Sequence, residues 1–335
     1  MADGTYVIYG SEYSPFSVKV RSYFRFKKIP HEWRPRTREN FAEFQELAKL
    51  PLIPLVHCPD GTVLQDSTPI LEKMEAVFPD NPISPADQNL GFLSAMLEEY
   101  GDEWVNKPMF HYRWWGDEDQ IAVANGLAKS IAPNAAEEEQ AQFAKDLRKR
   151  MVPRLSFVGS TEQNKPIIEQ SLEDLLGYLE SHLKGRDYLF GGRPAMGDFG
   201  LFGQLYGCTQ QPSTEGMIKD HPNVSDWIDR MKDPKATGDW AVWDDLAGTM
   251  APLLQNQMGE LYFPWAHANA SALKREDATF TVSIKGAEFT QDTMKYTGRS
   301  LQALRQKFAD IKPRGQLEQM LLTCDCLEPL LRESW

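Results

Sequence analysis

Cysteine is scarce in this sequence, with four residues in 335. Small secreted domains stapled by disulfides carry far more, so a disulfide framework is excluded. Cys324 and Cys326 flank a single aspartate near the end of the chain, but no partners stand at metal-binding spacing. We therefore expect surface thiols there, no metal site, and a protein that works in a reducing compartment.

Long apolar runs are also missing. No uninterrupted hydrophobic stretch approaches the roughly 18 residues of a membrane-spanning helix. The first five residues, Met1 to Thr5, have neither the charged nor the apolar region of a signal peptide. The sequence thus predicts a soluble protein of the cytoplasm that has no membrane partner.

The sequence has fewer basic than acidic residues: 36 Lys and Arg against 48 Asp and Glu, which gives a formal net charge of −12. The densest basic stretch, Arg34 to Arg38, is interrupted by Pro35 and Thr37. An acidic surface repels phosphate backbones, so nucleic acid is not an expected partner. Hydrophobic residues at 41% and charged residues at 25% are typical of globular chains, and the length suits two domains, or two domains and an appendage.

The first eighty residues alternate strand and helix signals. Residues 6–9 are a β-rich run, and a helix is expected to begin at Ser14-Pro15, because serine suits the N-cap and proline the first helical position. A second strand over 31–34, a hairpin over 55–65 with turn residues at Pro59 to Thr62, and a helix from Thr68 to Phe78 follow. This order is typical of a small α/β layer.

Later residues are mostly helical. Pro82 and Pro85 indicate a linker, and apolar residues at helical spacing then recur through residues 86–233. Beyond 234 the signals are less regular, with short strands expected over 280–284 and 287–290 and a helix over 301–311. We expect an α/β domain over 1–82, an all-α domain over 86–233, and a C-terminal extension over 234–335 packed on the helical domain.

Three short segments carry candidate chemistry. Ser14 either only caps its helix, its hydroxyl accepting the amide of Phe16 or Ser17, or lends its hydroxyl and the helix dipole to a bound anion such as a thiolate. Ile53-Pro54 opens a strand, and a cis bond there would leave the backbone of Ile53 free for an added peptide strand. Asp66 and Ser67 precede a helix, where they either cap it or hold the ammonium and carboxylate of a ligand.

Together these segments resemble the soluble glutathione S-transferase superfamily, serine-type, over residues 5–233. The resemblance rests on the order and spacing of Ser14-Pro15-Phe16 with Val20-Arg21, Ile53-Pro54, Asp66-Ser67, Gly192 to Asp198, and His221 to Val224 with Trp227. It implies an α/β thioredoxin-like N-terminal domain followed by an all-α helical domain, a homodimer, and glutathione as co-substrate.

The resemblance also implies residue roles. Ser14 would stabilise the glutathione thiolate, and the tripeptide would contact Ser14, Phe16, Ile53, Pro54, Asp66 and Ser67. Two other hydroxyls remain alternatives to Ser14: Tyr9, at the end of the first strand where tyrosine-type classes place their catalytic residue, and Tyr13.

The sequence departs from the family pattern at three places. Ala195 stands where a capping serine or threonine is usual, so only the Asp198 half of that cap remains. Ser17 stands where a redox Cys-Pro-Phe-Cys motif has its second cysteine, which excludes dithiol chemistry at residues 14–17. Because residue 14 is also serine, a glutaredoxin-like reductase is disfavoured. The residues from 234 onward exceed the usual length of the family.

An aromatic stretch in the helical domain contains Tyr100, Trp104 and His111. Helical aromatic stripes usually belong to a core. The resemblance implies instead that this helix lines the acceptor pocket, which makes the three residues candidates for contact with an apolar, aromatic electrophile. The expected function is activation of glutathione for conjugation, or for a related lyase, ether-cleaving or isomerising reaction in detoxification. The alternative is a non-catalytic carrier of apolar ligands or a protein partner.

Overall fold

The N-terminal domain is built on a mixed sheet of four strands. The computed structural model describes residues 4–332. The strands are β1 (Tyr6–Gly10), β2 (His31–Pro35), β3 (Leu55–His57) and β4 (Val63–Gln65), in the order β2-β1-β3-β4. β2 runs parallel to β1, whereas β3 and β4 are antiparallel to their neighbours. The strands and the hairpin predicted from the sequence are confirmed.

Alternating side chains of β1 divide the sheet between two helical layers. Ile8 lies in the main core with α1 (Pro15–Phe26) and α3 (Ser67–Val77). Tyr9 points to the other face, where it packs with Phe44 of α2 (Phe41–Leu47). A period of two residues therefore sets which side chains can reach α1 and which reach α2.

Helices make up the rest of the chain to residue 231. A long rod consists of α4 (Gln88–Tyr100), the π-helical turn η1 (Gly101–Val105) and α5 (Asn106–Trp115). The other elements are α6 (Asp117–Ile131), α7 (Glu137–Met151), η2 (Val152–Val158), α8 (Lys165–Leu183), α9 (Met196–Cys208), α10 (Pro212–Lys219) and α11 (Pro222–Met231). α9 packs on α1 and α4 and so joins the two domains. A Cβ at Gly203 of α9 would lie 2.5 Å from the carbonyl oxygen of Pro15, so glycine permits this approach.

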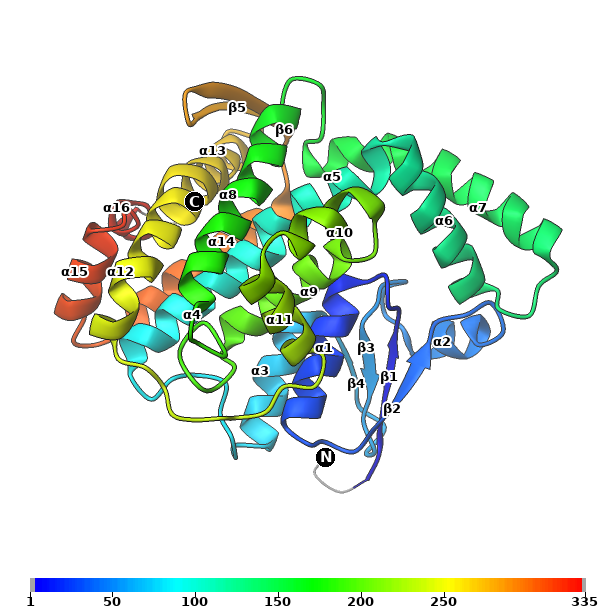
Figure 1. Ribbon diagram of the computed structural model, residues 1–335, viewed down its shortest axis with the longest axis horizontal. Helices are drawn as coiled ribbons and strands as arrows, with labels where there is room; N and C mark the ends of the chain where they lie inside the picture. Colours follow the sequence, from blue (N-terminus) through cyan, green and yellow to red (C-terminus); the bar gives the residue numbers. More distant parts are fainter. Residues whose placement is uncertain (1–3, 333–335) are drawn as a thin grey trace.

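The C-terminal segment, residues 234–332, folds against the helical domain. It comprises α12 (Trp243–Leu254), η3 (Gln255–Tyr262), α13 (Phe263–Lys274), β5 (Thr279–Ile284), β6 (Ala287–Asp292), α14 (Lys295–Asp310), α15 (Gly315–Leu322) and α16 (Leu327–Leu331). α12 packs on α8 and α14 packs on α4. In Figure 1 these yellow to red helices form the side of the molecule opposite the α6–α7 pair.

Two expectations from the sequence need correction. Cys324 and Cys326, expected as surface thiols, are fully buried, because the turn between α15 and α16 folds onto η3, where Gly259 meets the carbonyl of Cys324. The third helix begins at Ser67 with Asp66 at the N-cap position, one residue before the expected start. No separate helix was predicted from the sequence over the residues of α6 and α7.

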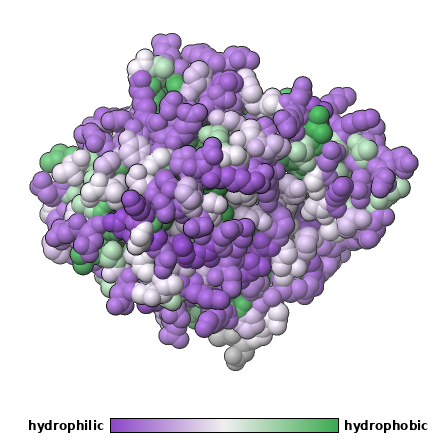
Figure 2. Space-filling view, viewed as in Figure 1, coloured by the Kyte–Doolittle hydropathy of each residue, from purple (hydrophilic) through white to green (hydrophobic). Residues whose placement is uncertain are grey.

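The face of the molecule drawn in Figure 2 is mostly polar. On the face in Figure 2, hydrophobic residues form scattered spots rather than one continuous patch. Within residues 4–332, no helix combines the length and the apolar character that crossing a bilayer requires.

Asp198 supplies half of the cap of α9, as expected. Its carboxylate accepts hydrogen bonds from the amide of Ala195 at 2.8 Å, the amide of Leu189 at 3.0 Å and the indole of Trp227 at 2.9 Å. Ala195, at the N-cap with extended backbone, offers no side-chain acceptor in return. The reciprocal half of the capping box is absent.

Restoring the missing side-chain cap at residue 195 should raise the free energy of unfolding. In Ala195→Ser, the new hydroxyl can accept the amide of Asp198, which is worth about 1 kcal/mol at an N-cap. We expect the urea midpoint of unfolding to rise without a change in the slope of the transition. An unchanged or lower midpoint would show that the site has no room for the hydroxyl.

Candidate functional site

Three predicted site segments meet at one end of the sheet. Tyr9 of β1 pairs with Leu55 of β3, and Leu55 pairs with Gln65 of β4. The chain leaves β1 toward Ser14, enters β3 from Pro54 and leaves β4 into Asp66 at this same end. Strand register therefore brings Ser14 close to Asp66, although the two residues are far apart in the sequence.

Ser14 is the N-cap of α1. Its Oγ accepts the amide of Ser17 at 3.3 Å, and Pro15 occupies the first helical position. Among the described residues, the Oγ has no acceptor for its own proton, and the amide of Phe16 has no hydrogen-bond partner. The hydroxyl of Ser17 is buried without a partner. The tip of α1 thus holds unused donors beside its positive dipole end, an arrangement that suits an anion.

The backbone of Ile53 is unpaired. The Ile53-Pro54 bond is cis, and within residues 4–332 neither the amide nor the carbonyl of Ile53 takes part in a hydrogen bond. Gln65 holds the preceding loop, because its amide donates to the carbonyls of Leu50 and Leu52 at 2.8 and 2.9 Å. An extended peptide could pair with Ile53 as an added strand.

Asp66 has an unusual backbone. Its φ is 78° and its ψ is 128°, a region that residues other than glycine rarely adopt. Strained residues of this kind concentrate at ligand clamps. The hydroxyl of the adjacent Ser67 is buried without a partner, although Ser67 stands at the first turn of α3, where a bound acidic group would be favoured.

A buried lysine joins the two domains behind this site. Lys19 of α1 is fully buried, and its ammonium donates to Glu98 at 2.5 Å, Asp102 at 2.7 Å and the hydroxyl of Thr68 at 3.2 Å. The two carboxylates raise the pKa of Lys19 and oppose the effect of burial. Lys19 therefore stays charged and fixes the start of α3 against α1 and the α4 rod.

Tyr9, one alternative to Ser14, is engaged elsewhere. Its hydroxyl donates to Glu43 of α2 at 2.5 Å and accepts from Arg34 at 2.9 Å. Burial and the bond to Glu43 raise the pKa of this phenol. Because Tyr9 points to the α2 face of the sheet, it has no contact with the tip of α1 among the interactions found.

Tyr13, the other alternative, packs toward the helical domain. A Cβ at Gly126 of α6 would overlap the hydroxyl of Tyr13, so the ring lies tightly against that helix. Arg113 donates to the carbonyl of Tyr13 at 2.8 Å and is itself 5% exposed. Arg113 has no carboxylate partner among the described residues, so its charge adds to the positive field beside Ser14.

The three aromatic candidates for the acceptor side are core residues here. Each has an exposed fraction of 0%. Tyr100 donates to Gln257 of η3 at 2.5 Å, Trp104 donates to Ser171 of α8 at 3.1 Å, and His111 bonds Ser160 at 2.7 Å. Their polar atoms are turned to α8, the η2–α8 loop and the C-terminal segment, and these contacts lend no support to a role in an acceptor pocket.

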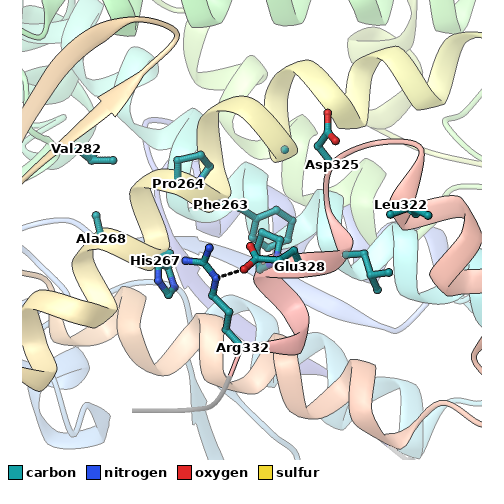
Figure 3. A pocket seen from close by; sticks show the side chains of 12 residues that line it. Phe263, Pro264, His267, Ala268, Val282, Leu322, Asp325, Glu328 and Arg332 are labelled. Carbon is teal, nitrogen blue, oxygen red and sulfur yellow. Dashed lines mark hydrogen bonds and ion pairs between the residues drawn. The ribbon is translucent and has the colours of Figure 1, made fainter.

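A cavity of about 530 Å³ lies in the C-terminal segment. Figure 3 shows its walls, which include Phe263, His267 and Leu322, and the ion pair of Arg332 with Glu328 at 2.7 Å. No residue predicted as part of the site from the sequence lines this cavity. It is therefore separate from the end of the sheet described above.

Sequence reasoning missed Lys19, Arg113 and Tyr296. In the sequence, Lys19 looks like any polar residue of an amphipathic helix, and Arg113 lies within a stretch of aromatic residues, so neither was recognised as a candidate. Tyr296 of α14 donates to Asp66 at 2.8 Å across 230 positions of sequence, for which no local pattern exists.

Two segments match known family models. Residues 13–77 match the glutathione S-transferase N-terminal domain, and residues 134–230 match the glutathione S-transferase C-terminal domain. The matches support the glutathione S-transferase superfamily and confirm the predicted fold class, a thioredoxin-like domain followed by a helical domain. No curated protein matched the sequence.

The solved structures to which this chain is similar include two glutathione transferases and a β-etherase. Glutathione transferase GSTFuA3 from Phanerochaete chrysosporium is 17% identical, with 68% of this chain and 96% of that chain covered and a TM-score of 0.49. The β-etherase LigF from Sphingobium sp. strain SYK-6 is 19% identical, with 68% and 95% covered and a TM-score of 0.47. A glutathione S-transferase from Methylobacterium radiotolerans, in complex with glutathione sulfonate, is 17% identical, with 69% and 92% covered and a TM-score of 0.41. None of the three TM-scores reaches 0.5, so the fold assignment rests on the chain's own elements and the two family matches.

Behind the site, Glu99 of α4 is buried, with hydroxyl donors but no cation partner among the described residues. Tyr262 donates to it at 2.6 Å, and Ser300 also donates to it. Burial, reinforced by the nearby Glu103, raises the pKa of Glu99 to about 8. The folded state therefore retains a proton on Glu99 that the unfolded chain loses above about pH 4.5.

This proton makes stability pH-dependent. The pKa of Glu99 is higher in the folded protein than in the unfolded chain. Its contribution to the free energy of unfolding is therefore complete below about pH 4.5 and is lost as the pH rises toward about 8. One pKa unit corresponds to about 1.4 kcal/mol. In Glu99→Gln, we expect the fall in unfolding free energy between acid and alkaline pH to shrink by more than that amount, measured by urea titrations at several pH values. Glu118→Gln, at an exposed position of α6, should keep the wild-type slope; equal slopes in all three proteins would contradict the assignment.

Proposed function

We propose that this chain, which matches both domains of the glutathione S-transferase superfamily, is a glutathione-dependent transferase or lyase. The observation that carries the proposal is the meeting of unpaired groups at one end of the sheet: the donors at the tip of α1, the backbone of Ile53, and the buried hydroxyl of Ser67 beside Asp66. Buried polar groups without partners are rare, and a ligand is one way to satisfy them.

The arrangement fits a tripeptide with a charged end. Ile53 would pair its free amide and carbonyl with the cysteinyl backbone of glutathione, as in strand addition. Asp66 supplies a carboxylate for the ammonium of the γ-glutamyl group. Ser67 and the N-terminus of α3 suit the carboxylate of that same group.

Ser14 would stabilise the sulfur. Its hydroxyl proton has no acceptor among the described residues, so it can donate to a thiolate placed at the tip of α1. The dipole of α1 and the charge of Arg113 favour the same anion, and each lowers the pKa of a bound thiol. Glutathione supplies the nucleophile, which attacks an electrophilic carbon of the acceptor.

The acceptor side is proposed to begin at Tyr13. This residue directly precedes Ser14 and packs against the apolar cluster formed by Trp114 and α6. Such walls suit an apolar, aromatic electrophile. Conjugation, ether cleavage and isomerisation share the activated thiolate, and the proposal covers this class of reaction in detoxification. The homodimer and the cytoplasmic location implied by the resemblance stay predictions, and light scattering after size-exclusion chromatography tests the first.

Ser14→Ala tests the mechanism. Loss of a hydrogen bond to a charged group costs about 1.5–3 kcal/mol, so we expect turnover below pH 7 to fall roughly 10- to 100-fold, with the pH–rate profile shifted to higher pH. Glutathione affinity should change little, because most contacts lie at Ile53, Asp66 and Ser67. The measurements are glutathione turnover with a chlorodinitrobenzene across pH, and calorimetric titration with glutathione.

Tyr9→Phe serves as the matched control, because it also removes one hydroxyl near the end of β1. We expect its pH profile to equal that of the wild type. A profile unchanged in Ser14→Ala but shifted in Tyr9→Phe would transfer the role to Tyr9. Glutathione binding without turnover on a broad panel of electrophiles would instead favour a carrier.

A further inference from the structure

Helix α14 of the C-terminal segment reaches back to the N-terminal domain. Three hydroxyls in its first two turns point at acidic side chains: Tyr296 donates to Asp66 at 2.8 Å, Thr297 donates to Glu103 at 2.6 Å, and Ser300 donates to Glu99. Further along the helix, Lys307 pairs with Glu72 of α3 at 2.7 Å. α14 is thus attached to α3 and to the α4 rod at the same time.

Hydrogen bonds to α13 also fix the start of α14. The amide of Met294 donates to the side chain of Asn269 in α13 at 2.7 Å, and the amide group of Asn269 donates to the carbonyl of Met294 at 2.9 Å. Asn269 is fully buried. These two hydrogen bonds therefore fix the start of α14, whereas Tyr296 is itself 56% exposed and meets Asp66 at the surface.

The Tyr296 hydroxyl occupies one side of the Asp66 carboxylate. It bonds Oδ2, and no described residue bonds Oδ1. Because a carboxylate accepts about four hydrogen bonds, this contact leaves room for an ammonium group. Burial, followed by the charge of Asp66, raises the pKa of Tyr296, so the phenol stays protonated and acts as the donor.

We propose that Tyr296 is a positioning residue for the γ-glutamyl end of glutathione, supplied by the C-terminal segment. The inference rests on the proposed function. Tyr296 orients the carboxylate of Asp66, whose backbone already holds a rarely adopted conformation, so that its free oxygen meets the ligand's ammonium. In this respect the C-terminal segment completes the binding site of the first domain.

Tyr296→Phe removes the hydroxyl and keeps the ring. One hydrogen bond to a charged group is lost, so we expect the dissociation constant for glutathione to rise about three- to tenfold. Cysteinylglycine lacks the γ-glutamyl group, and its dissociation constant should not change. The turnover number at saturating glutathione should stay at the wild-type value, because Tyr296 does not contact the sulfur.

The matched control is Lys307→Gln, which breaks an ion pair of the same helix on the exposed side of α3. It should bind both ligands as the wild type does. Thermal unfolding of both variants checks that α14 remains docked.

Three results would overturn the inference: equal glutathione affinity in Tyr296→Phe and wild type, an equal loss for glutathione and cysteinylglycine, or a higher affinity, which would mean that Tyr296 obstructs the ligand. These results differ from failure of the proposed function, in which the wild-type protein itself would bind no glutathione by calorimetry.

Discussion

The register of the small sheet is the constraint on which the site depends. Pairing of Tyr9 with Leu55, and of Leu55 with Gln65, places the tip of α1, the backbone of Ile53 and the Asp66-Ser67 pair at one end of the strands. A shift by one residue would turn every side chain of β3 to the other face of the sheet and separate these groups. The chemistry is therefore a consequence of strand pairing more than of any single side chain.

Charged side chains behind the sheet hold this end of it against the helical domain. Lys19 binds Thr68 as well as Glu98 and Asp102, so one ammonium spans α1, α3 and the α4 rod. On the outer side, three hydroxyls of α14 bind acidic side chains at the start of α3 and on the α4 rod. Breaking a buried pair is costly because the remaining charge has no partner, so these contacts favour one relative placement of the two domains and the C-terminal segment.

The sequence predicts the parts of this structure that depend on local signals. Serine followed by proline marks the start of α1, a short β-rich run marks β1, and glycine with proline marks the turn before β4. Asp66, Ser67 and Ile53 were found by the same means. The contact of Tyr296 with Asp66 and the burial of Cys324 were not, because each depends on packing between distant segments. Tyr100 and Trp104 also pack against the C-terminal segment, which the family resemblance does not cover.

The central claim is that the tip of α1 and the hydroxyl of Ser14 keep a bound thiol ionised near neutral pH. The most direct measurement is the ultraviolet absorbance of the thiolate in the complex of wild-type protein with glutathione, titrated from acid to alkaline pH. The account predicts a thiol pKa well below the ordinary thiol value of about 8.5. A bound thiol that titrates at that value, in a complex shown by calorimetry to have formed, would contradict it.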